Sequence, residues 1–388
     1  SFHNMCKNHL GRSAEKAVKH PIIINSWEAM YFDITEKRIE NLVRSCRGLG
    51  IDTFVLDDGW FSCRKSDNSS LGDWYIDKNK FPNGLKNIIS ICKENGMSFG
   101  IWFEPEMISE NSELYRRHPD WCIHTPGCAP IESRSQLVLD MARSEVVDCI
   151  YNQLATLLNE YDITYVKWDM NRNITDNGSA SLSADAQGEH AYRYILGVYS
   201  LMDRLTKAFP DVLFEGCAGG GGRFDFGILY YMPQIWTSDD TDAVERLKIQ
   251  YGTSMVYPVS AMTAHVSACP NHQTGRITPF KTRGDIAQIC NFGYELDASK
   301  LSSDETEQIK EQIKLHKKIE PMIYNGDFYR LISPFESDCC CWQIAAQDKK
   351  NSAVVFATQK ATPNSGGFYI KLRGLDPDRK STRLNSSH

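Results

Sequence analysis

The sequence predicts a (β/α)8 barrel followed by the beginning of an antiparallel β domain. Short apolar runs of β type alternate with amphipathic helical stretches from about residue 21 to about residue 320, and such alternation implies a parallel sheet. Seven or eight repeats are present, which suits a closed barrel of about 250 residues. No Gly-x-Gly-x-x-Gly turn follows the first apolar run, so an open dinucleotide-binding sheet is disfavoured.

The expected barrel strands are apolar runs at 22–25, 53–56, 98–103, 165–168, 213–215, 234–237 and 264–266, with an eighth near 293–296. Helical spacing of apolar residues separates them. In the stretch 38–49 one face carries Ile39, Leu42, Val43, Cys46 and Leu49. The stretches 145–161 and 306–319 show the same pattern, so both are predicted helices.

The sequence pattern changes from alternating β-like and helical stretches to short β-like runs after residue 321. Short β-like runs at 327–331, 341–344 and 353–356 are separated by turn residues, which is typical of antiparallel strands. We therefore expect a linker remnant at 1–20, the barrel at 21–321 and a partial, truncated β-sheet domain at 322–378. Residues 379–388 are polar and break the pattern, as a non-native, adapter-like tail would. The missing initiator Met suggests that the chain is a fragment.

Composition excludes several classes of protein. The net charge is −6 with a pI near 6.0, and without a basic run no nucleic-acid partner is expected. No apolar stretch is long enough for a membrane span, and the start lacks the pattern of a signal peptide. The thirteen cysteines form no regular framework, and the adjacent Cys339, Cys340 and Cys341 do not match zinc spacing. Unpaired thiols in a reducing, cytoplasmic compartment are therefore expected.

Polar and aromatic residues follow most of the predicted strands. The candidates are Asp57 and Asp58, Trp102, the set Lys167, Asp169 and Asn171, then Cys217 with the glycines at 219–222, and Asp239. In a barrel, the carboxyl ends of the strands carry the active site. A single Asp at such a position could cap a helix, and a Trp is more often core. Helix caps alone, however, do not require Trp or Lys at strand ends.

The pattern indicates a site for a neutral sugar. Carboxylates at Asp57 and Asp58 can accept hydrogen bonds from hydroxyl groups, Lys167 can donate, and indole faces can cover a pyranose ring. Asp169 and Asp239 supply the two carboxylates that glycoside hydrolysis requires. The cation at Lys167 favours an ionised Asp169, whereas an acid at Asp239 needs a raised pKa.

Two other aspartates, Asp240 and Asp242, compete with Asp239 for the role of the acid. His265 and His272 lie at no zinc spacing with supporting ligands, so structural roles are expected for both. Neither a metal nor a cofactor is predicted.

In order along the chain, these runs resemble the α-galactosidases of glycoside hydrolase family 36 over roughly residues 15–375. The matching runs are NSWEA at 25–29, VLDDGWF at 55–61, SLGDW at 70–74, WFEPEM at 102–107, KWDMNR at 167–172, CAGGGGR at 217–223 and SDDTD at 238–242. The resemblance implies a barrel that cleaves terminal α-galactosides with retention of configuration. It also implies that an N-terminal β-sandwich is missing and that the full-length protein is a homo-oligomer, often a tetramer.

By the same resemblance Asp169 is the nucleophile and Asp239 the acid/base, and this match favours Asp239 over its rivals. The positions that match the galactose pocket are Asp57, Asp58, Trp102, Arg134, Lys167, Cys217 and Gly220. Expected substrates are α-galactoside oligosaccharides such as melibiose and raffinose.

Several alternatives stay open. A raffinose-synthase-type galactosyltransferase would use the same nucleophile, and a non-catalytic sugar-binding barrel would keep the pocket alone. A metal-dependent sugar isomerase is disfavoured by the missing ligand cluster, and α-N-acetylgalactosamine is a further substrate to test.

Overall fold

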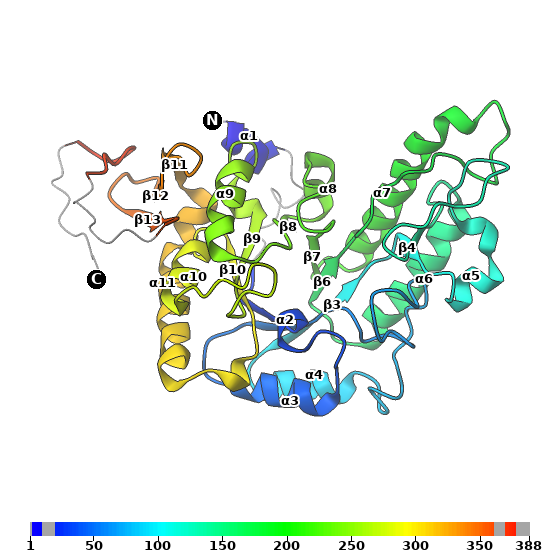
Figure 1. Cartoon of the computed structure of the whole chain (residues 1–388), viewed down its shortest axis with the longest axis horizontal. Coiled ribbons are helices and arrows are strands. Elements are labelled where there is room, and N and C mark those ends of the chain that lie inside the picture. Colours follow the sequence, from blue (N-terminus) through cyan, green and yellow to red (C-terminus); the bar gives the residue numbers. More distant parts are fainter. Residues whose placement is uncertain (1, 10–19, 361–368, 378–388) are drawn as a thin grey trace.

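The computed structural model describes residues 2–9, 20–360 and 369–377, and it contains the predicted barrel (Figure 1). Eight parallel strands close in the order β1-β10-β9-β8-β7-β6-β3-β2. They are β1 (Ile23–Asn25), β2 (Thr53–Leu56), β3 (Ser98–Phe103), β6 (Tyr165–Trp168), β7 (Leu213–Gly216), β8 (Gln234–Trp236), β9 (Met262–Ser267) and β10 (Asn291–Glu295). The fold class is confirmed.

A small apolar cluster shows which side chains of the strands share the inner face of the barrel. Ile23, Val55, Tyr165 and Leu213 pack together, separately from the main core around the strands. Because side chains alternate along a strand, the residues two and four positions further on point to the same side. From Tyr165, this rule brings Lys167 and then Asp169 to the mouth of the barrel.

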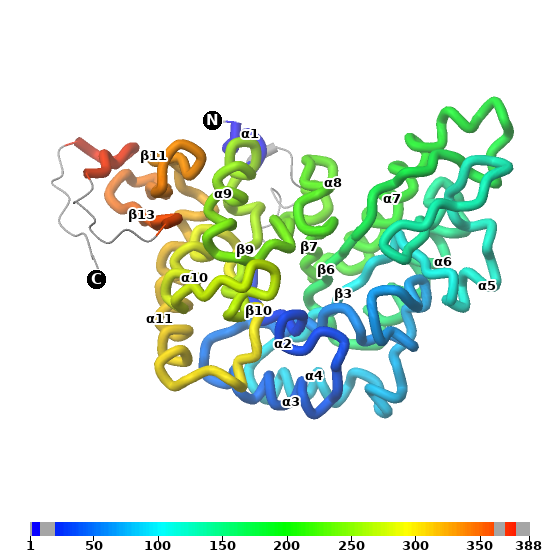
Figure 2. The backbone as a smooth tube through the Cα atoms, viewed as in Figure 1, coloured from blue at the N-terminus to red at the C-terminus, as the bar shows by residue number. Residues whose placement is uncertain are grey.

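Eight helices follow the eight strands and cover them (Figure 2). They are α3 (Glu36–Ser45), α4 (Lys86–Glu94), α6 (Ser144–Glu160), α7 (His190–Ala208), α8 (Phe226–Tyr231), α9 (Ala243–Thr253), α10 (Phe280–Ala287) and α11 (Ser303–Asn325). Side-chain caps fix where several begin. Thr35 accepts from the backbone N–H of Arg38, and Ser302 forms a capping box with Glu305.

Short additional elements lie between the barrel strands and their helices. A helical turn, α2 (Trp27–Met30), follows β1 directly. Between β3 and β6 the chain adds the paired strands β4 (Met107–Ile108) and β5 (Leu137–Val138), with α5 (Glu113–Arg117) between them. The 3₁₀ helices are Pro119–Trp121, Gln187–Glu189, Val259–Ala261 and Ala298–Lys300. The loop that carries Arg134 belongs to this excursion.

The C-terminal part is an antiparallel sheet of β11 (Asp327–Ile332), β12 (Cys339–Ala345) and β13 (Ser352–Thr358). Helix α11 connects it to the barrel and continues four residues past Pro321, so the predicted boundary at 321 falls inside a helix. The expected tail at 379–388 lies outside the described residues.

A helix that the sequence did not predict lies within the expected linker remnant. It is α1 (Phe2–His9), whose Phe2 ring meets the Phe226 ring edge-on at 5.7 Å. Lys7 Nζ donates to the Tyr324 carbonyl at 3.0 Å. Helix α1 thus contacts both the barrel and the end of α11.

Two expectations from composition concern cysteines and membranes. All thirteen cysteines fall in the described ranges, and none is paired there. Within the same ranges, no helix combines the length and the apolarity that crossing a bilayer demands.

Candidate active site

Asp57 and Lys167 form a buried ion pair across the mouth of the barrel. Asp57 follows β2, and its Oδ2 accepts from Lys167 Nζ at 2.9 Å and from Asn25 Nδ2 at 2.6 Å. Burial alone would lower the pKa of Lys167, but the Asp57 carboxylate raises it well above its ordinary value. The site therefore keeps a fixed positive charge between β2 and β6.

Asp58 is held by an arginine that the sequence analysis did not single out. Arg64 donates from Nε to Oδ1 at 3.0 Å and from Nη2 to Oδ2 at 2.7 Å. Burial raises the pKa of Asp58, while the guanidinium counteracts that shift. This bidentate contact fixes the carboxyl plane, and each oxygen keeps capacity for one further donor.

Asp169 receives hydrogen bonds on both of its oxygens. The indole N–H of Trp102 donates to Oδ2 at 3.1 Å, and the backbone N–H of Met170 donates to Oδ1 at 2.9 Å. The buried thiol of Cys217 provides a further hydrogen bond. Three donors therefore hold one carboxylate in a single orientation.

Asp239 lies beyond the end of β8, and its carboxyl has fewer hydrogen-bond donors around it than that of Asp169. The indole N–H of Trp236 donates to Asp239 Oδ1 at 3.0 Å. Burial raises the pKa of Asp239, and the nearby Asp169 carboxylate raises it further; the charge of Lys167 and the indole hydrogen bond act in the opposite direction. Two neighbouring carboxyls with different environments are the arrangement expected of an acid and a nucleophile.

The two rivals of Asp239 have other partners. Asp242 caps α9 by accepting from the N–H groups of Val244 and Glu245, and it pairs with Arg276 at 2.6 Å. Asp240 accepts from the Asp242 N–H at 3.0 Å. Both carboxylates therefore stabilise the loop between β8 and α9.

The glycine-rich loop after β7 contacts both Asp169 and the segment that carries Asp239. Gly220 pairs with Ser238 and donates to Cys217 Sγ at 3.4 Å. Its φ is +87°, and a Cβ there would lie 2.5 Å from Ser238 Cα and 2.8 Å from the Asp239 nitrogen. Only glycine permits this close approach. Burial raises the pKa of Cys217 well above its ordinary value, so the thiol stays neutral.

Arg134 and Asn171 lie at the entrance. Arg134 is exposed, and its Nη1 donates to the Asn171 carbonyl at 3.2 Å. Arg134 and Ser135 have φ values of +53° and +55°, a backbone conformation that is costly for residues other than glycine. The Asn171 side chain accepts from the Gly219 N–H at 3.1 Å and so ties the loops after β6 and β7 together.

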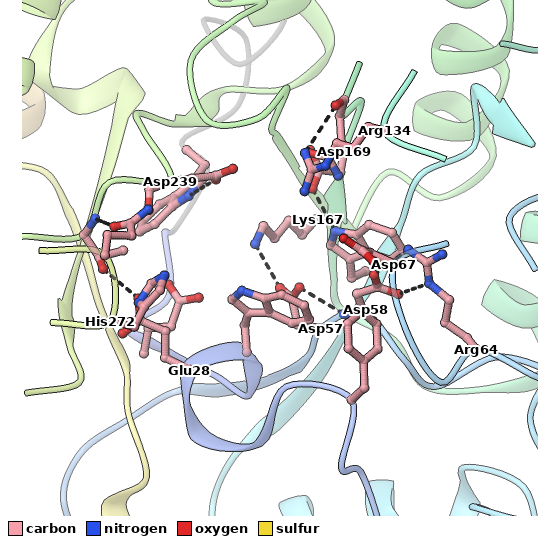
Figure 3. A pocket seen from close by; sticks show the side chains of 18 of the residues that line it. Glu28, Asp57, Asp58, Arg64, Asp67, Arg134, Lys167, Asp169, Asp239 and His272 are labelled. Atoms are coloured by element: carbon pink, nitrogen blue, oxygen red, sulfur yellow. Dashed lines mark hydrogen bonds and ion pairs between the residues drawn. The ribbon is translucent and has the colours of Figure 1, made fainter. Parts of the chain in front are cut away.

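These side chains surround one cavity of about 280 Å³ (Figure 3). This volume lies near the lower end of the range for ligand pockets, about 300–1,000 Å³. Every predicted site residue borders the cavity except Cys217 and Gly220, which contact the residues that do. Figure 3 shows Asp169 and Asp239 on two sides of the cavity, with Lys167 between them and Asp57 below.

The cavity has further lining residues that the sequence analysis did not assign to the site. Arg64 borders the cavity beside Asp58, and Glu28, Trp236, His272 and Glu295 border it as well. Glu295 ends β10, so the rule of polar strand ends could have identified it.

The predicted structural role of the two histidines describes only part of what the structure shows. His272 Nδ1 lies 3.3 Å from Glu28 Oε1, and this partner raises the pKa of His272. His265 Nδ1 lies 3.2 Å from Glu295 Oε2. His272 nevertheless borders the cavity. Across the described ranges, no cluster of three or more His, Cys, Asp or Glu could hold a metal ion.

Comparison with known proteins identifies the family. The family model described as Melibiase matches residues 1–326. The chain is 50% identical over 379 residues to α-galactosidase AgaA of Geobacillus stearothermophilus, covering 98% of this chain and 52% of the relative. It is 48% identical over 386 residues to α-galactosidase Mel36A of Lactobacillus acidophilus, covering 100% of this chain and 53% of the relative.

Solved structures agree with the sequence match. The crystal structure of the GH36 α-galactosidase AgaA from Geobacillus stearothermophilus superposes with a TM-score of 0.94 at 51% identity, covering 97% of this chain and 52% of that one. The present chain thus spans about half the length of the curated relatives that it matches. With the Melibiase model matched over residues 1–326, the chain belongs to the melibiase family, and its resemblance to glycoside hydrolase family 36 is confirmed.

Proposed function

We propose that this chain carries the catalytic barrel of a retaining α-galactosidase. It removes terminal, non-reducing α-D-galactose residues from oligosaccharides such as melibiose and raffinose. The observation that carries the proposal is the pairing of Asp169, held by three donors, with Asp239, whose pKa is raised, on one small cavity. This pairing supplies an attacking carboxylate and a proton donor.

The galactose ring is proposed to bind with its hydroxyl groups toward the ion pair of Asp57 and Lys167. Asp57 accepts from one hydroxyl while Lys167 donates to another, and Asp58 takes a third. Trp102 borders the cavity and donates to Asp169. The same residue therefore fixes the nucleophile and offers an apolar surface to the sugar.

In the first step, Asp169 attacks the anomeric carbon while Asp239 gives its proton to the glycosidic oxygen. The bond to the leaving group breaks, and a covalent galactosyl-enzyme forms. In the second step, Asp239, now a carboxylate, takes a proton from water. The water oxygen attacks the anomeric carbon and releases Asp169, so the configuration is retained.

Relatives support this assignment. AgaA variants with a replaced aspartate have been crystallised with raffinose and with stachyose, and the two aspartates replaced are 70 positions apart in that protein. Asp169 and Asp239 are separated by the same number of residues. Loss of either catalytic carboxylate is expected to leave the bound oligosaccharide intact, which suits crystallisation of such complexes.

The proposal extends to the setting of the full-length protein. We infer a cytoplasmic enzyme of raffinose catabolism, since all thirteen cysteines are unpaired. Its partners are α-galactoside oligosaccharides, without nucleic acid or membrane, as its mildly acidic charge suggests. A homo-oligomer, in the form of a tetramer, is proposed from the family resemblance.

Hydrolysis of p-nitrophenyl α-galactoside and raffinose by the 388-residue chain tests the proposal. Asp169→Asn should abolish turnover of both substrates. Asp239→Asn should spare the aryl galactoside, whose leaving group needs little protonation, far more than raffinose. The matched control is Asp240→Asn, which keeps an acceptor for its loop hydrogen bond and should leave both rates near those of the unaltered chain.

NMR of the first-formed galactose should show the α anomer. Near-normal activity of Asp169→Asn, or a β anomer as the first product, contradicts the mechanism. Galactosyl transfer to added sucrose in place of water would identify the alternative galactosyltransferase.

A further inference from the structure

The side chain of Arg246 lies directly behind the loop that carries Asp239. Arg246 is in the first turns of α9 and is 4% exposed. Its Nη2 donates to the Ser238 carbonyl at 2.7 Å, and its Nε donates to the Asp240 carbonyl, also at 2.7 Å. One planar guanidinium therefore holds the backbone on both sides of Asp239.

The same guanidinium also packs on the aromatic residue that contacts the Asp239 carboxyl. The Arg246 Cζ atom lies 4.4 Å from the centre of the Trp236 ring. The Trp236 indole donates to Asp239 Oδ1 at 3.0 Å. Arg246 thus reaches Asp239 by two routes, through the flanking carbonyls and through the indole.

A buried arginine with these partners is costly to keep. In the described part of the chain, no carboxylate forms an ion pair with Arg246, whose partners are carbonyl oxygens, including that of Thr263 at 3.4 Å. A buried charge without a counter-charge destabilises a fold unless hydrogen bonds compensate. The carbonyl oxygens of Ser238, Asp240 and Thr263 supply that compensation for Arg246.

We propose that Arg246 is a positioning residue for the acid/base Asp239. The N–H groups of its guanidinium hold the carbonyls on both sides of Asp239, and the guanidinium packs on the Trp236 indole. Together these contacts present the Asp239 carboxyl to the glycosidic oxygen in one orientation. This inference rests on the proposed function, because it assigns to Arg246 a role in protonating the leaving group.

The next βα unit contains a matched control. Arg283 in α10 is also buried, at 8% exposed, and donates to the carbonyls of Thr278 and Ser267. Its Cζ atom lies 4.8 Å from the centre of the Phe280 ring. It uses the same chemistry at the end of β9, but neither carbonyl flanks a proposed catalytic residue.

The test compares Arg246→Met and Arg283→Met in the 388-residue chain with raffinose and with p-nitrophenyl α-galactoside. A misplaced acid costs about 100-fold in rate, so kcat/KM of Arg246→Met should fall about that much with raffinose and less than about tenfold with the aryl galactoside. Azide should accelerate its turnover of the aryl substrate and give α-galactosyl azide. Arg246→Lys keeps the charge and one donor group, and should recover part of the raffinose activity.

Arg283→Met should lose activity equally on both substrates, if it loses any. An unchanged substrate ratio in both Arg246 variants, or the same change of ratio in Arg283→Met, overturns the proposal. If Arg246→Met does not fold, the ratio of raffinose activity to aryl galactoside activity in Arg246→Lys decides the question alone.

A crystal structure of the better-folded Arg246 variant gives a readout that does not depend on activity. The Asp239 carboxyl should leave the Trp236 N–H, and an unmoved carboxyl overturns the inference. Failure of the unaltered chain to cleave either substrate would count against the proposed function, whereas the crystal structure would still test the role of Arg246.

Discussion

Replacement of Trp236 by phenylalanine would remove one hydrogen bond from the proposed acid. The indole N–H donates to Asp239 Oδ1 at 3.0 Å and lowers the pKa of a group that burial and Asp169 raise. Phenylalanine keeps a ring for Arg246 to pack on but has no donor. The change therefore alters the protonation of Asp239 as well as the orientation of its carboxyl, and a pH profile separates the first effect from the second.

The size of the effect follows from the charge on the acceptor. A hydrogen bond to a charged group contributes about 1.5–3 kcal/mol, and one pKa unit corresponds to about 1.36 kcal/mol. A protonated Asp239 would still accept a weaker hydrogen bond, so only part of this energy distinguishes the two forms. We expect Trp236→Phe to raise the pKa of Asp239 by about one unit, and the smaller ring to cost about 1–2 kcal/mol of stability.

The assay is the pH dependence of kcat/KM with raffinose. In the proposed mechanism Asp239 must be protonated in the first step, so the alkaline limb of the profile is expected to report its pKa. A higher pKa keeps the acid protonated to a higher pH, and the limb should move up by about one unit. Trp102→Phe removes the corresponding donor from Asp169 and should leave the alkaline limb where it is. The reasoning is refuted by an unmoved or lowered limb in Trp236→Phe, or by an equal shift in Trp102→Phe.

Three further predictions follow from the surroundings of the two carboxyls. Gly220→Ala would place a Cβ 2.5 Å from Ser238 Cα, so the loop must move; kcat/KM should fall more for raffinose than for the aryl galactoside, and equal losses would contradict this. Burial and the charge of Asp169 raise the pKa of Glu104 from its ordinary value of 4.5 to about 8. The folded chain then binds a proton that the unfolded chain releases, so stability should fall as pH rises between these values. Urea unfolding across this pH range should show a flatter slope for Glu104→Gln, and an unchanged slope would exclude Glu104 as its source. Hydrolysis through two carboxylates needs no metal, so overnight dialysis against EDTA should leave activity unchanged, and loss with recovery on adding a divalent ion would refute that.

The barrel was predictable because its strands obey a simple physical rule. A strand buried on both faces reads as an apolar run, and β2, β3 and β6 have the predicted bounds. Side-chain alternation then placed Lys167, Asp169 and Asn171 on one face, and all three border the cavity. The short N-terminal helix α1 was missed, because it has only eight residues, Phe2, Met5 and Cys6 are its apolar positions, and so short a stretch gives little periodicity.

The parts of the site that lie on loops could not be derived in this way. Arg64 binds Asp58 from a loop six residues further on, and Arg134 comes from an excursion between β3 and β6. Neither position follows from periodicity, since a loop side chain is placed by the packing of its own loop. The family resemblance supplied Arg134, whereas only the structure showed Arg64.

The proposed division of roles between the two carboxyls depends on how many hydrogen-bond donors each receives. Asp169 has the Trp102 indole, the Met170 N–H and the Cys217 thiol, whereas the side chain of Asp239 accepts from the Trp236 indole. Negative charge is more stable where more donors converge, so the proton is expected on Asp239 before cleavage. In the proposed mechanism Asp169 becomes part of the covalent intermediate, and its charge then no longer raises the pKa of Asp239. The acid of the first step can then release its proton and become the base of the second. The alternation of roles that the proposed retaining mechanism requires therefore follows from the electrostatic coupling of two aspartates in one cavity.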